Sequence, residues 1–268
     1  MINDDQLPKR YRDVIDEQEE IFSEGRSITV HNSIPDTADI PLDNQRLWLR
    51  IPDVICVFVD MKGSTQLSAD TYDNNTAGAY QLFTSTSVRL FHEFESPYVD
   101  VRGDGAFALF NSSQPYRALA AAVTIKTFAE IIFVPKIKEL TGLDIGCHIG
   151  VDQQTVLVRR IGLRRSGGKT DRQNEVWAGK PVNMASKLAS LGENKELLVS
   201  DRYFENLDDE HALLTCGCPG GEKVDLWSDV DVSEKSVFDF DIAHRLGSKW
   251  CSEHGKEYCE KILSLDED

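Results

Sequence analysis

The chain of 268 residues carries a formal net charge of −16, and 41% of its residues are hydrophobic and 28% charged. This composition is ordinary for a globular protein long enough to bury a core, and the acidic charge argues against a nucleic-acid-binding protein. We find no apolar run approaching the roughly 18 residues that cross a bilayer. The polar N-terminus lacks a signal peptide's apolar stretch, so we expect a cytoplasmic protein without a membrane partner.

Apolar periodicity predicts alternating strands and helices along the chain. Helices are predicted near 10–23 and at about 75–94, 116–139 and 180–191. Strands are predicted at 54–59, 98–101, 106–110, 144–151, 155–161 and 197–199. This order is typical of an α+β fold, in which helices pack on one face of a mainly antiparallel sheet. We expect an N-terminal helix and linker over 1–45, a main domain over 46–235 and a C-terminal appendage over 236–268.

The first chemical motif is a carboxylate at the end of an apolar run. Residues 54–59 are all apolar and are followed by Asp60, Met61, Lys62, Gly63, Ser64 and Thr65. A carboxylate in this position does not serve packing, and the next residues are suited to open a helix whose free backbone N–H groups bind phosphate oxygens. The alternative is that Asp60 only caps this helix.

The second motif places another carboxylate in a predicted hairpin. Gly103, Asp104 and Gly105 are typical of a tight turn. If this hairpin pairs with the strand that ends at Asp60, the two carboxylates come together. With the Met61 carbonyl and phosphate oxygens they would form an oxygen-only site suited to Mg²⁺ or Mn²⁺. The alternative is an ordinary turn.

The third motif is a polar pair at the start of the helix predicted over 180–191. Pro181 suits a first helical turn, and Asn183 and Lys187 are four residues apart, on one face. An amide beside a cation can orient a ribose and bind phosphate charge, although an ordinary exposed helix face has the same pattern. The residues from Arg159 to Lys187 include eight basic and two acidic side chains, a local charge of +6 that favours a small anionic ligand or a solvated loop.

The three motifs, in this order and spacing, resemble the catalytic domain of class III adenylyl and guanylyl cyclases over about Val54–Trp227. The resemblance implies a ferredoxin-like cyclase fold and a homodimer in which both protomers contribute to each active site. It implies two divalent cations, manganese or magnesium, held by Asp60, Met61 and Asp104. It implies that Asn183 positions the ribose and that Lys187 and Lys223 neutralise phosphate charge. The other substrate-binding residues that the resemblance implies are Lys62, Gly63, Ser64 and Thr65. Asp100 and Arg102 are implied to contact the nucleobase of the substrate.

Departures from the family pattern concern the base and the phosphates. Lys187 stands where the family usually has arginine, so the planar guanidinium that can bind a phosphate through two hydrogen bonds is absent. Ser64 stands where the family has a phenylalanine at the start of the helix. Asp100 and Val176 replace the lysine and the aspartate that read adenine. Asp100 and Arg102 are two residues apart in a strand, so their side chains share a face. Asp100 as hydrogen-bond acceptor and Arg102 as donor could together recognise the edge of uracil or cytosine.

With the long insertion over 164–175 and a C-terminus containing cysteine and histidine, this pattern resembles the bacterial pyrimidine cyclases of Pycsar antiphage defence. That narrower resemblance implies conversion of UTP or CTP to the 3′,5′-cyclic mononucleotide and pyrophosphate, as a second messenger for a separate effector. The alternatives are a guanylyl or adenylyl cyclase in bacterial signalling, and a degenerate cyclase domain acting as a nucleotide sensor. The presence of both Asp60 and Asp104 counts against degeneracy.

The six cysteines are expected to be reduced in the cytoplasm. Cys56 and Cys147 fall inside predicted strands as small buried hydrophobes. A structural zinc site is conceivable from Cys216, Cys218, Cys251, His254 and Cys259. The Cys-x-Cys spacing is tighter than usual and 32 residues separate the two halves, so the sequence favours cysteines that only pack.

Overall fold

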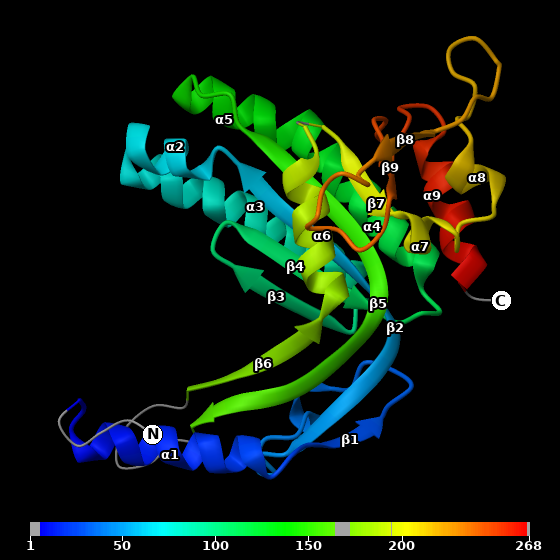
Figure 1. Cartoon of the computed structure of the whole chain (residues 1–268). Helices are drawn as coiled ribbons and strands as arrows, with labels where there is room; N and C mark the ends of the chain where they lie inside the picture. Colours follow the sequence, from blue (N-terminus) through cyan, green and yellow to red (C-terminus); the bar gives the residue numbers. More distant parts are fainter. Residues whose placement is uncertain (1–5, 164–171, 194, 267–268) are drawn as a thin grey trace. The chain divides into compact units, whose positions relative to one another are not determined.

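The computed structural model describes residues 6–163, 172–193 and 195–266 (Figure 1). The chain forms two compact units: Met1–Pro52 with Val156–Ala178, and Asp53–Thr155 with Gly179–Asp268. Most of the insertion over 164–175, including Arg164, Arg165 and Lys169, lies outside the described residues. These units differ from the divisions expected at 45/46 and 235/236, because residues 156–178 pack with the N-terminal segment.

The first unit is built around the ends of two long strands. It contains helix α1 (Lys9–Ser23), strand β1 (Ser27–Val30), a 3₁₀ turn (Thr37–Asp39), the start of β2 (Leu47–Lys62), the end of β5 (Gly146–Leu163) and strand β6 (Arg172–Gly179). β1 pairs in parallel with β2, and β6 pairs with β5. Helix α1 confirms the helix predicted near 10–23, but no side chain of α1 is buried.

Two arginines of the predicted basic stretch have structural partners in this unit. The Arg159 guanidinium is buried and donates hydrogen bonds to the carbonyls of Gln45 and Leu42. The Arg160 side chain lies 3.5 Å from a carboxylate oxygen of Glu175. These side chains are therefore engaged within the protein and do not form a free anion site.

The second unit contains most of the sheet, in which the main strand order is β3-β4-β2-β5-β7-β9-β8. Its further strands are β3 (Tyr98–Arg102), β4 (Gly105–Phe110), β7 (Leu197–Ser200), β8 (Trp227–Asp231) and β9 (Ile242–Leu246). β4 pairs antiparallel with β2 and β3, and β9 pairs antiparallel with β7 and β8. β5 and β7 are parallel. The predicted α+β class with a mainly antiparallel sheet is confirmed.

Most helices of this unit cover one face of the sheet, where the main core lies. They are α2 (Ser64–Asp70), α3 (Asp73–Glu93), α4 (Pro115–Phe128), a π-helical turn (Ala129–Phe133), α5 (Val134–Thr141), α7 (Asp201–Phe204), α8 (Glu210–Leu213), α9 (Gly255–Leu263) and a last 3₁₀ turn (Ser264–Asp266). Phe83 and Phe91 of α3 are fully buried, and the Phe91 ring packs edge-on against Phe110 of β4. Val59 and Met61 of β2 belong to the same core.

Helix α6 (Lys180–Leu191) departs from the expected one-sided arrangement because it packs on the opposite face (Figure 1). Leu197 and Val199 of β7 belong to the main core, whereas Leu198 between them packs in a second cluster with Leu188 of α6. A side chain at Gly150 of β5 would put its Cβ 2.0 Å from the backbone carbonyl of α6. Only glycine permits this close approach of helix and strand.

Two sequence predictions of the fold are wrong in their detail. Residues 146–163 form one continuous strand instead of the two separate strands predicted at 144–151 and 155–161, because the polar run between them is extended and not a turn. The residues after Lys235 are no appendage, since β9 lies inside the sheet between β7 and β8.

The prediction that no apolar run approaches membrane-spanning length holds for uninterrupted runs, but one helical stretch interrupted by Lys126 and Glu130 passes a test of length and mean composition. Among the described residues, the continuous helical stretch Pro115–Thr141 contains an 18-residue window with a mean hydropathy of 1.7. Of this window, 56% is buried inside the protein, and Leu119, Ile125 and Phe133 belong to the main core. A buried core helix meets the same two criteria as a membrane span.

Candidate active site

Asp60 lies on the face of the sheet opposite the main core, at the end of β2. Its neighbours Val59 and Met61 point into the core, and side chains alternate along a strand, so the Asp60 carboxylate faces the other way. In the β2–β4 ladder Asp60 lies opposite Gly105, where an added Cβ would come within 2.8 Å of Asp60 Oδ1. Glycine at position 105 thus makes room for the carboxylate.

Asp104 lies in the turn between β3 and β4, directly before Gly105. Arg102 pairs with Gly105 across the hairpin, and Gly103 has a φ of 66°, the left-handed conformation that favours glycine. Burial, and after it the negative charge of Asp104, raise the pKa of Asp60 to about 6. The hairpin therefore brings the two predicted carboxylates together, as the sequence analysis expected.

The residues of this site fit divalent cations. A side chain at position 105 would fill the space beside the Asp60 carboxylate. Asp104 is close enough for its charge to repel ionised Asp60, and a positive ion would relieve this repulsion. The Met61 side chain is buried in the core, so only its backbone carbonyl is available as a ligand.

The predicted phosphate-binding segment follows directly. Gly63 has a φ of 87° and precedes the first residue of α2, Ser64, and its carbonyl accepts a hydrogen bond from the Leu67 amide. The amides of Ser64 and Thr65 lie in the first turn, where a helix provides no intrahelical acceptor. Lys62 is exposed on β2.

The structure adds His148 of β5, which the sequence analysis did not select. Cys147 and Ile149 point into the core, so His148 lies on the same face of the sheet as Asp60. Burial, and after it the positive charge of Lys62, lower the pKa of His148, and its Nε2 atom is buried without a hydrogen-bond partner among the described residues. The sequence did hold a signal for His148, because it lies two residues before Gly150 in a predicted strand and therefore on the same face.

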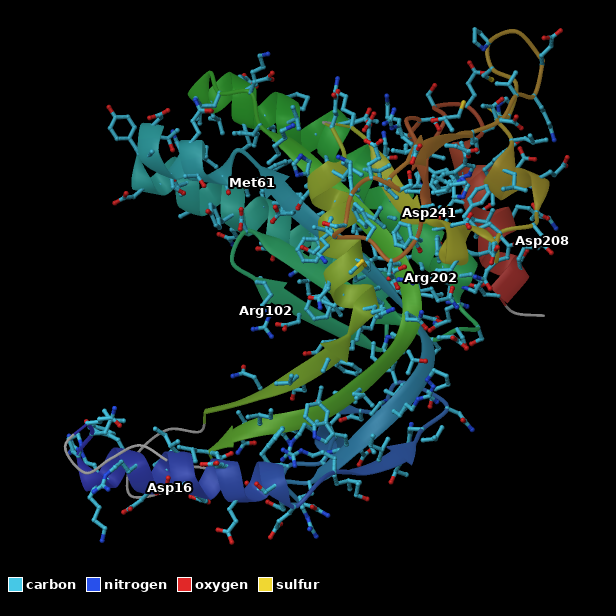
Figure 2. The ribbon with its side chains drawn as sticks, in the orientation of Figure 1. Asp16, Met61, Arg102, Arg202, Asp208 and Asp241 are labelled. Carbon is cyan, nitrogen blue, oxygen red and sulfur yellow. The ribbon has the colours of Figure 1, made fainter. Side chains whose placement is uncertain are left out.

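Asp100 and Arg102 of β3 do share a face, and they form an ion pair with 2.6 Å between Asp100 Oδ2 and an Arg102 guanidinium nitrogen. Asp100 lies opposite Phe107 in the ladder, on the face away from the main core. The Arg102 side chain is 56% exposed, and it projects from β3 toward solvent (Figure 2). The pair therefore presents an acceptor and a donor side by side.

Asn183 and Lys187 lie on α6 as predicted, and both are engaged in hydrogen bonds with the backbone. Asn183 Nδ2 donates to the Gly179 carbonyl over 3.3 Å, and Lys187 Nζ donates to the Val237 carbonyl over 2.9 Å. The segment that contains Val237 is anchored by Asp239, which accepts hydrogen bonds from Lys180 and Arg202.

The described contacts of Lys223 do not include Asp60, Asp104, Asn183 or Lys187. Its Nζ is 3.2 Å from a carboxylate oxygen of Glu210 of α8, and the hydrogen bond to Glu210, with smaller effects of Tyr258, raises the pKa of Lys223. Among the described contacts of one chain, Asp60 is thus grouped with Asp104, Lys187 with Val237, and Lys223 with Glu210.

The Asp60 pKa predicts how stability depends on pH without metal. An acid whose folded pKa of about 6 exceeds its unfolded value stabilises the fold below about pH 4, and this stabilisation is lost as the pH rises through 6. A two-unit shift corresponds to about 3 kcal/mol, which we reduce to about 1 kcal/mol because Asp60 is partly exposed. In EDTA at pH 7, Asp60→Asn should therefore raise the free energy of unfolding by about 1 kcal/mol, with less gain at pH 5.

Urea denaturation at the two pH values measures this effect. Asp144→Asn is the matched control, because Asp144 is exposed and pairs with Lys138 over 3.4 Å, so it should change stability by only a few tenths of a kcal/mol. Added MnCl₂ should stabilise the wild type and not Asp60→Asn. An unchanged or lower stability of Asp60→Asn at pH 7 in EDTA would show that burial and the charge of Asp104 do not destabilise ionised Asp60.

Comparison with known proteins shows the family to which the chain belongs. Residues 49–220 match the family model of the adenylate and guanylate cyclase catalytic domain, and the chain belongs to this family. It is a nucleotidyl cyclase, a phosphorus–oxygen lyase.

Two curated proteins of this family are similar to the chain over most of its length. The chain is 36% identical over 231 residues to a protein of Propioniciclava tarda named uridylate cyclase, covering 84% of this chain and 73% of the relative. It is 36% identical over 233 residues to a uridylate cyclase of Micromonospora echinofusca, covering 85% and 74%.

Solved structures share the fold at low sequence identity. The adenylyl cyclase CyaB from P. aeruginosa matches with a TM-score of 0.59 and 14% identity, over 75% of this chain and 96% of that chain. The guanylyl cyclase Cya2 matches with a TM-score of 0.58 and 17% identity, over 74% and 92%.

Proposed function

We propose that this nucleotidyl cyclase converts pyrimidine nucleoside triphosphates, UTP first and CTP second, to the 3′,5′-cyclic mononucleotide and pyrophosphate. The observation that carries the proposal is the Asp100–Arg102 ion pair, on the exposed face of β3 where the family reads its base. Valine at position 176 removes the second purine-reading side chain. The name of the two curated relatives, uridylate cyclase, supports the same substrate class.

The chemistry of the base explains why such a pair suits pyrimidines. The edge of uracil offers one N–H donor between two carbonyl acceptors, so a carboxylate can accept from the N–H while a guanidinium donates to a carbonyl. Cytosine presents an amine that Asp100 could also accept from. Cytosine also has acceptors for Arg102, so the pair by itself admits both bases. UTP is the first choice because the two relatives are named uridylate cyclase.

The reaction is a phosphoryl transfer within one substrate, in which the ribose 3′-oxygen attacks the α-phosphorus and pyrophosphate leaves. Asp60, Asp104 and the Met61 carbonyl hold two divalent cations, manganese or magnesium. When bound, such ions neutralise phosphate charge and favour ionisation of the attacking hydroxyl. The amides of Gly63, Ser64 and Thr65, with Lys62 beside them, receive phosphate oxygens.

The remaining roles belong to α6 and the loop before β8. Asn183 orients the ribose, and Lys187 and Lys223 neutralise charge on the phosphates. Lys187 would exchange its hydrogen bond to the Val237 carbonyl for one to phosphate, and Lys223 would exchange its ion pair with Glu210. We propose a homodimer in which the carboxylates of one protomer and α6 of its partner form each site, since one chain keeps these groups in separate contacts.

The product is proposed to act in the cytoplasm as a second messenger that activates a separate effector in antiphage defence. Measuring the cyclic pyrimidine nucleotide in cells before and after phage infection tests this role. A level that stays constant through infection would argue for general signalling.

Substrate preference is the direct test of the pyrimidine assignment. Incubation with ATP, GTP, CTP or UTP in Mn²⁺, followed by mass spectrometry of the products, should show at least about tenfold higher kcat/KM for a pyrimidine. Tenfold corresponds to only about 1.4 kcal/mol of transition-state binding, which is modest for a hydrogen-bonding pocket. Asp100→Asn should reduce this preference.

The matched control is Arg89→Gln, which removes an exposed arginine of α3 outside the site and should leave the preference unchanged. Cyclic GMP as the dominant product would refute the proposal and identify a guanylyl cyclase, in which Asp100 would read guanine. Absence of any cyclic product, with nucleotide still bound, would identify a sensor.

A further inference from the structure

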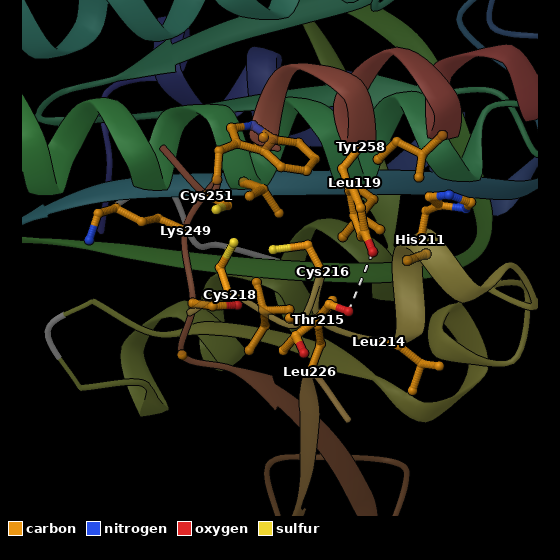
Figure 3. A pocket seen from close by; sticks show the side chains of 18 of the residues that line it. Leu119, His211, Leu214, Thr215, Cys216, Cys218, Leu226, Lys249, Cys251 and Tyr258 are labelled. Atoms are coloured by element: carbon orange, nitrogen blue, oxygen red, sulfur yellow. Dashed lines mark hydrogen bonds between the residues drawn. The ribbon is translucent and has the colours of Figure 1, made fainter. Parts of the chain in front are cut away.

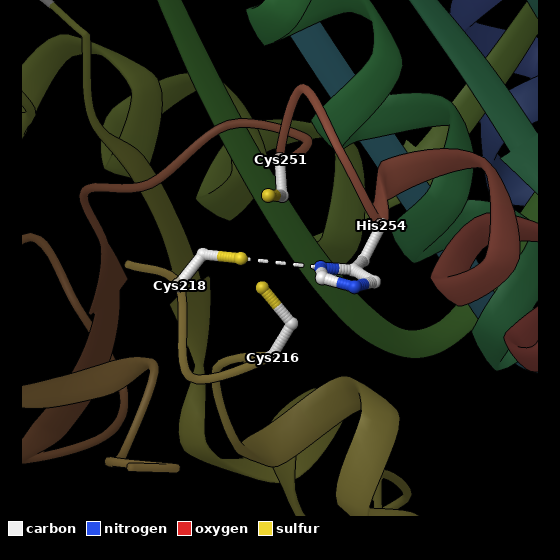
Figure 4. Close-up of side chains that lie close together, drawn as sticks. All are labelled: Cys216, Cys218, Cys251 and His254. Carbon is white, nitrogen blue, oxygen red and sulfur yellow. Dashed lines mark hydrogen bonds between the residues drawn. The ribbon is translucent and has the colours of Figure 1, made fainter. Parts of the chain in front are cut away.

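Three cysteines and a histidine from two distant segments meet on the second unit. Cys216 and Cys218 lie in the loop after α8, and Cys251 and His254 lie just before α9 (Figure 4). One ligand atom from each of the four lies within 4.8 Å of the other three. Cys218 Sγ is 3.2 Å from His254 Nδ1. We propose that these four side chains bind a structural zinc ion.

The ligand set and its dimensions suit zinc. Three thiolates and one imidazole form one of the common tetrahedral zinc sets, and Zn–S bonds of about 2.3 Å put the ligand atoms roughly 3.8 Å apart. Sulfur ligands do not suit the magnesium or manganese proposed at Asp60 and Asp104. Four protein ligands leave no open position, so this ion would stabilise the structure without taking part in the chemistry.

Exposure separates these cysteines from those that only pack. Cys56 and Cys147 are buried inside strands, whereas Cys218 is exposed and Cys216 and Cys251 are partly exposed. A thiol that serves as a small hydrophobe belongs in the core, which does not explain three thiols gathered at the surface. The sequence analysis preferred packing cysteines, and the structure departs from it for these three. Cys259 of α9 packs against the main core and is not part of the cluster.

Glycines allow both ligand segments to take their conformations. Gly217, between the two cysteines, has a φ of 84°, and a side chain there would place its Cβ 2.9 Å from the Gly221 backbone. Gly255, directly after His254, would place a Cβ 2.8 Å from the Trp250 side chain. Both loops are therefore shaped by close backbone packing that no larger residue permits.

Hydrogen bonds anchor each segment to the fold independently of a metal. The Trp250 indole donates to Thr124 Oγ1 of α4 over 2.9 Å, just before Cys251. The Tyr258 hydroxyl of α9 donates to the Thr215 carbonyl, just before Cys216. Such anchoring reduces the entropy lost when the four ligands assemble.

The cluster lies at the wall of a cavity of about 480 Å³ (Figure 3). Cys216, Cys218 and Cys251 line this cavity together with Leu119 and Trp250. A zinc ion would join the loop after α8 to the segment before α9 and so fix this wall. Removal of the ion is expected to loosen the C-terminal part of the second unit.

Metal analysis of the full chain tests the proposal. Protein expressed with added zinc and purified in reducing buffer should contain about one zinc per chain by plasma mass spectrometry. Cys216→Ser and Cys251→Ser should lose most of this zinc and melt at a lower temperature. The matched control Cys259→Ser, which changes a cysteine of α9 outside the cluster, should keep it.

Cobalt loading keeps the test decisive if the serine variants do not fold. Wild-type protein with Co²⁺ in place of zinc should show the strong visible absorption of a tetrahedral thiolate site. Wild-type protein that lacks zinc and shows no such absorption would overturn the proposal, as would an equal loss of zinc from Cys259→Ser and Cys251→Ser. These readouts are independent of cyclase activity, so they do not depend on the proposed substrate.

Discussion

Asp60→Ala and Asp104→Ala are each expected to abolish cyclisation while the protein stays folded. If the two carboxylates hold the cations, either change removes metal-bound charge stabilisation, and we expect a loss in kcat on the order of 10²–10³ or more. The readout is cyclic nucleotide formed from UTP in Mn²⁺, measured by mass spectrometry, with circular dichroism to check the fold. Neither change should harm metal-free stability, since burial, and after it the negative charge of Asp104, already raise the pKa of Asp60.

Two further variants distinguish loss of metal from loss of structure. Asp144→Ala removes an exposed carboxylate on the loop before β5 and should retain activity. Gly105→Ala keeps both carboxylates but adds a Cβ 2.8 Å from Asp60 Oδ1, so it should weaken Mn²⁺ binding. If Asp60→Ala or Asp104→Ala unfolds by circular dichroism in the absence of metal, that carboxylate is structural and its catalytic role is not supported.

The carboxylate pair could be predicted from the sequence because its signals are local. An apolar strand that ends in aspartate and a Gly-Asp-Gly turn are both read within a few residues, and one pairing of strand and hairpin brings Asp60 to Asp104. The shared face of Asp100 and Arg102 follows from strand alternation alone. Their ion pair could not be foreseen, because it depends on side-chain conformation in the folded hairpin.

Features that depend on distant packing were missed. Strand β9 is short and follows a polar segment, and its place between β7 and β8 is set by pairing across the sheet, which local periodicity does not show. The packing of α6 on the other face depends on Gly150, a single residue whose role appears only when Ala185 lies against it.

The cysteine cluster illustrates the same limit. A separation of 32 residues between Cys218 and Cys251 says nothing about distance once the chain folds back, and the anchoring of Trp250 on α4 brings the halves together. Lys223 also has a partner, Glu210, that no spacing rule indicates. His148 was not selected, although it lies in the strand predicted at 144–151.

A mixture of Asp104→Ala and Lys187→Ala chains is expected to recover activity that neither variant has alone. In the proposed homodimer each site takes Asp104 from one protomer and Lys187 from its partner, so both sites of either mutant homodimer lack one component. A mixed dimer has one site with both residues and one with neither. With random pairing about half of the dimers are mixed, so activity should approach roughly a quarter of wild type, given a two-fold symmetric interface.

The control is a mixture of Asp104→Ala with the double variant Asp104→Ala/Lys187→Ala, which exchanges protomers in the same way but never provides Asp104. It should stay inactive. Protomer exchange can be followed by mass spectrometry of the intact dimers, so a failure to mix is recognised. Lys187→Ala also removes the hydrogen bond to the Val237 carbonyl, and circular dichroism checks that this loss leaves α6 folded. If exchanging, folded mixtures of the two single variants remain as inactive as the separate proteins, each site must take Asp104 and Lys187 from the same chain, and the shared-site arrangement is wrong.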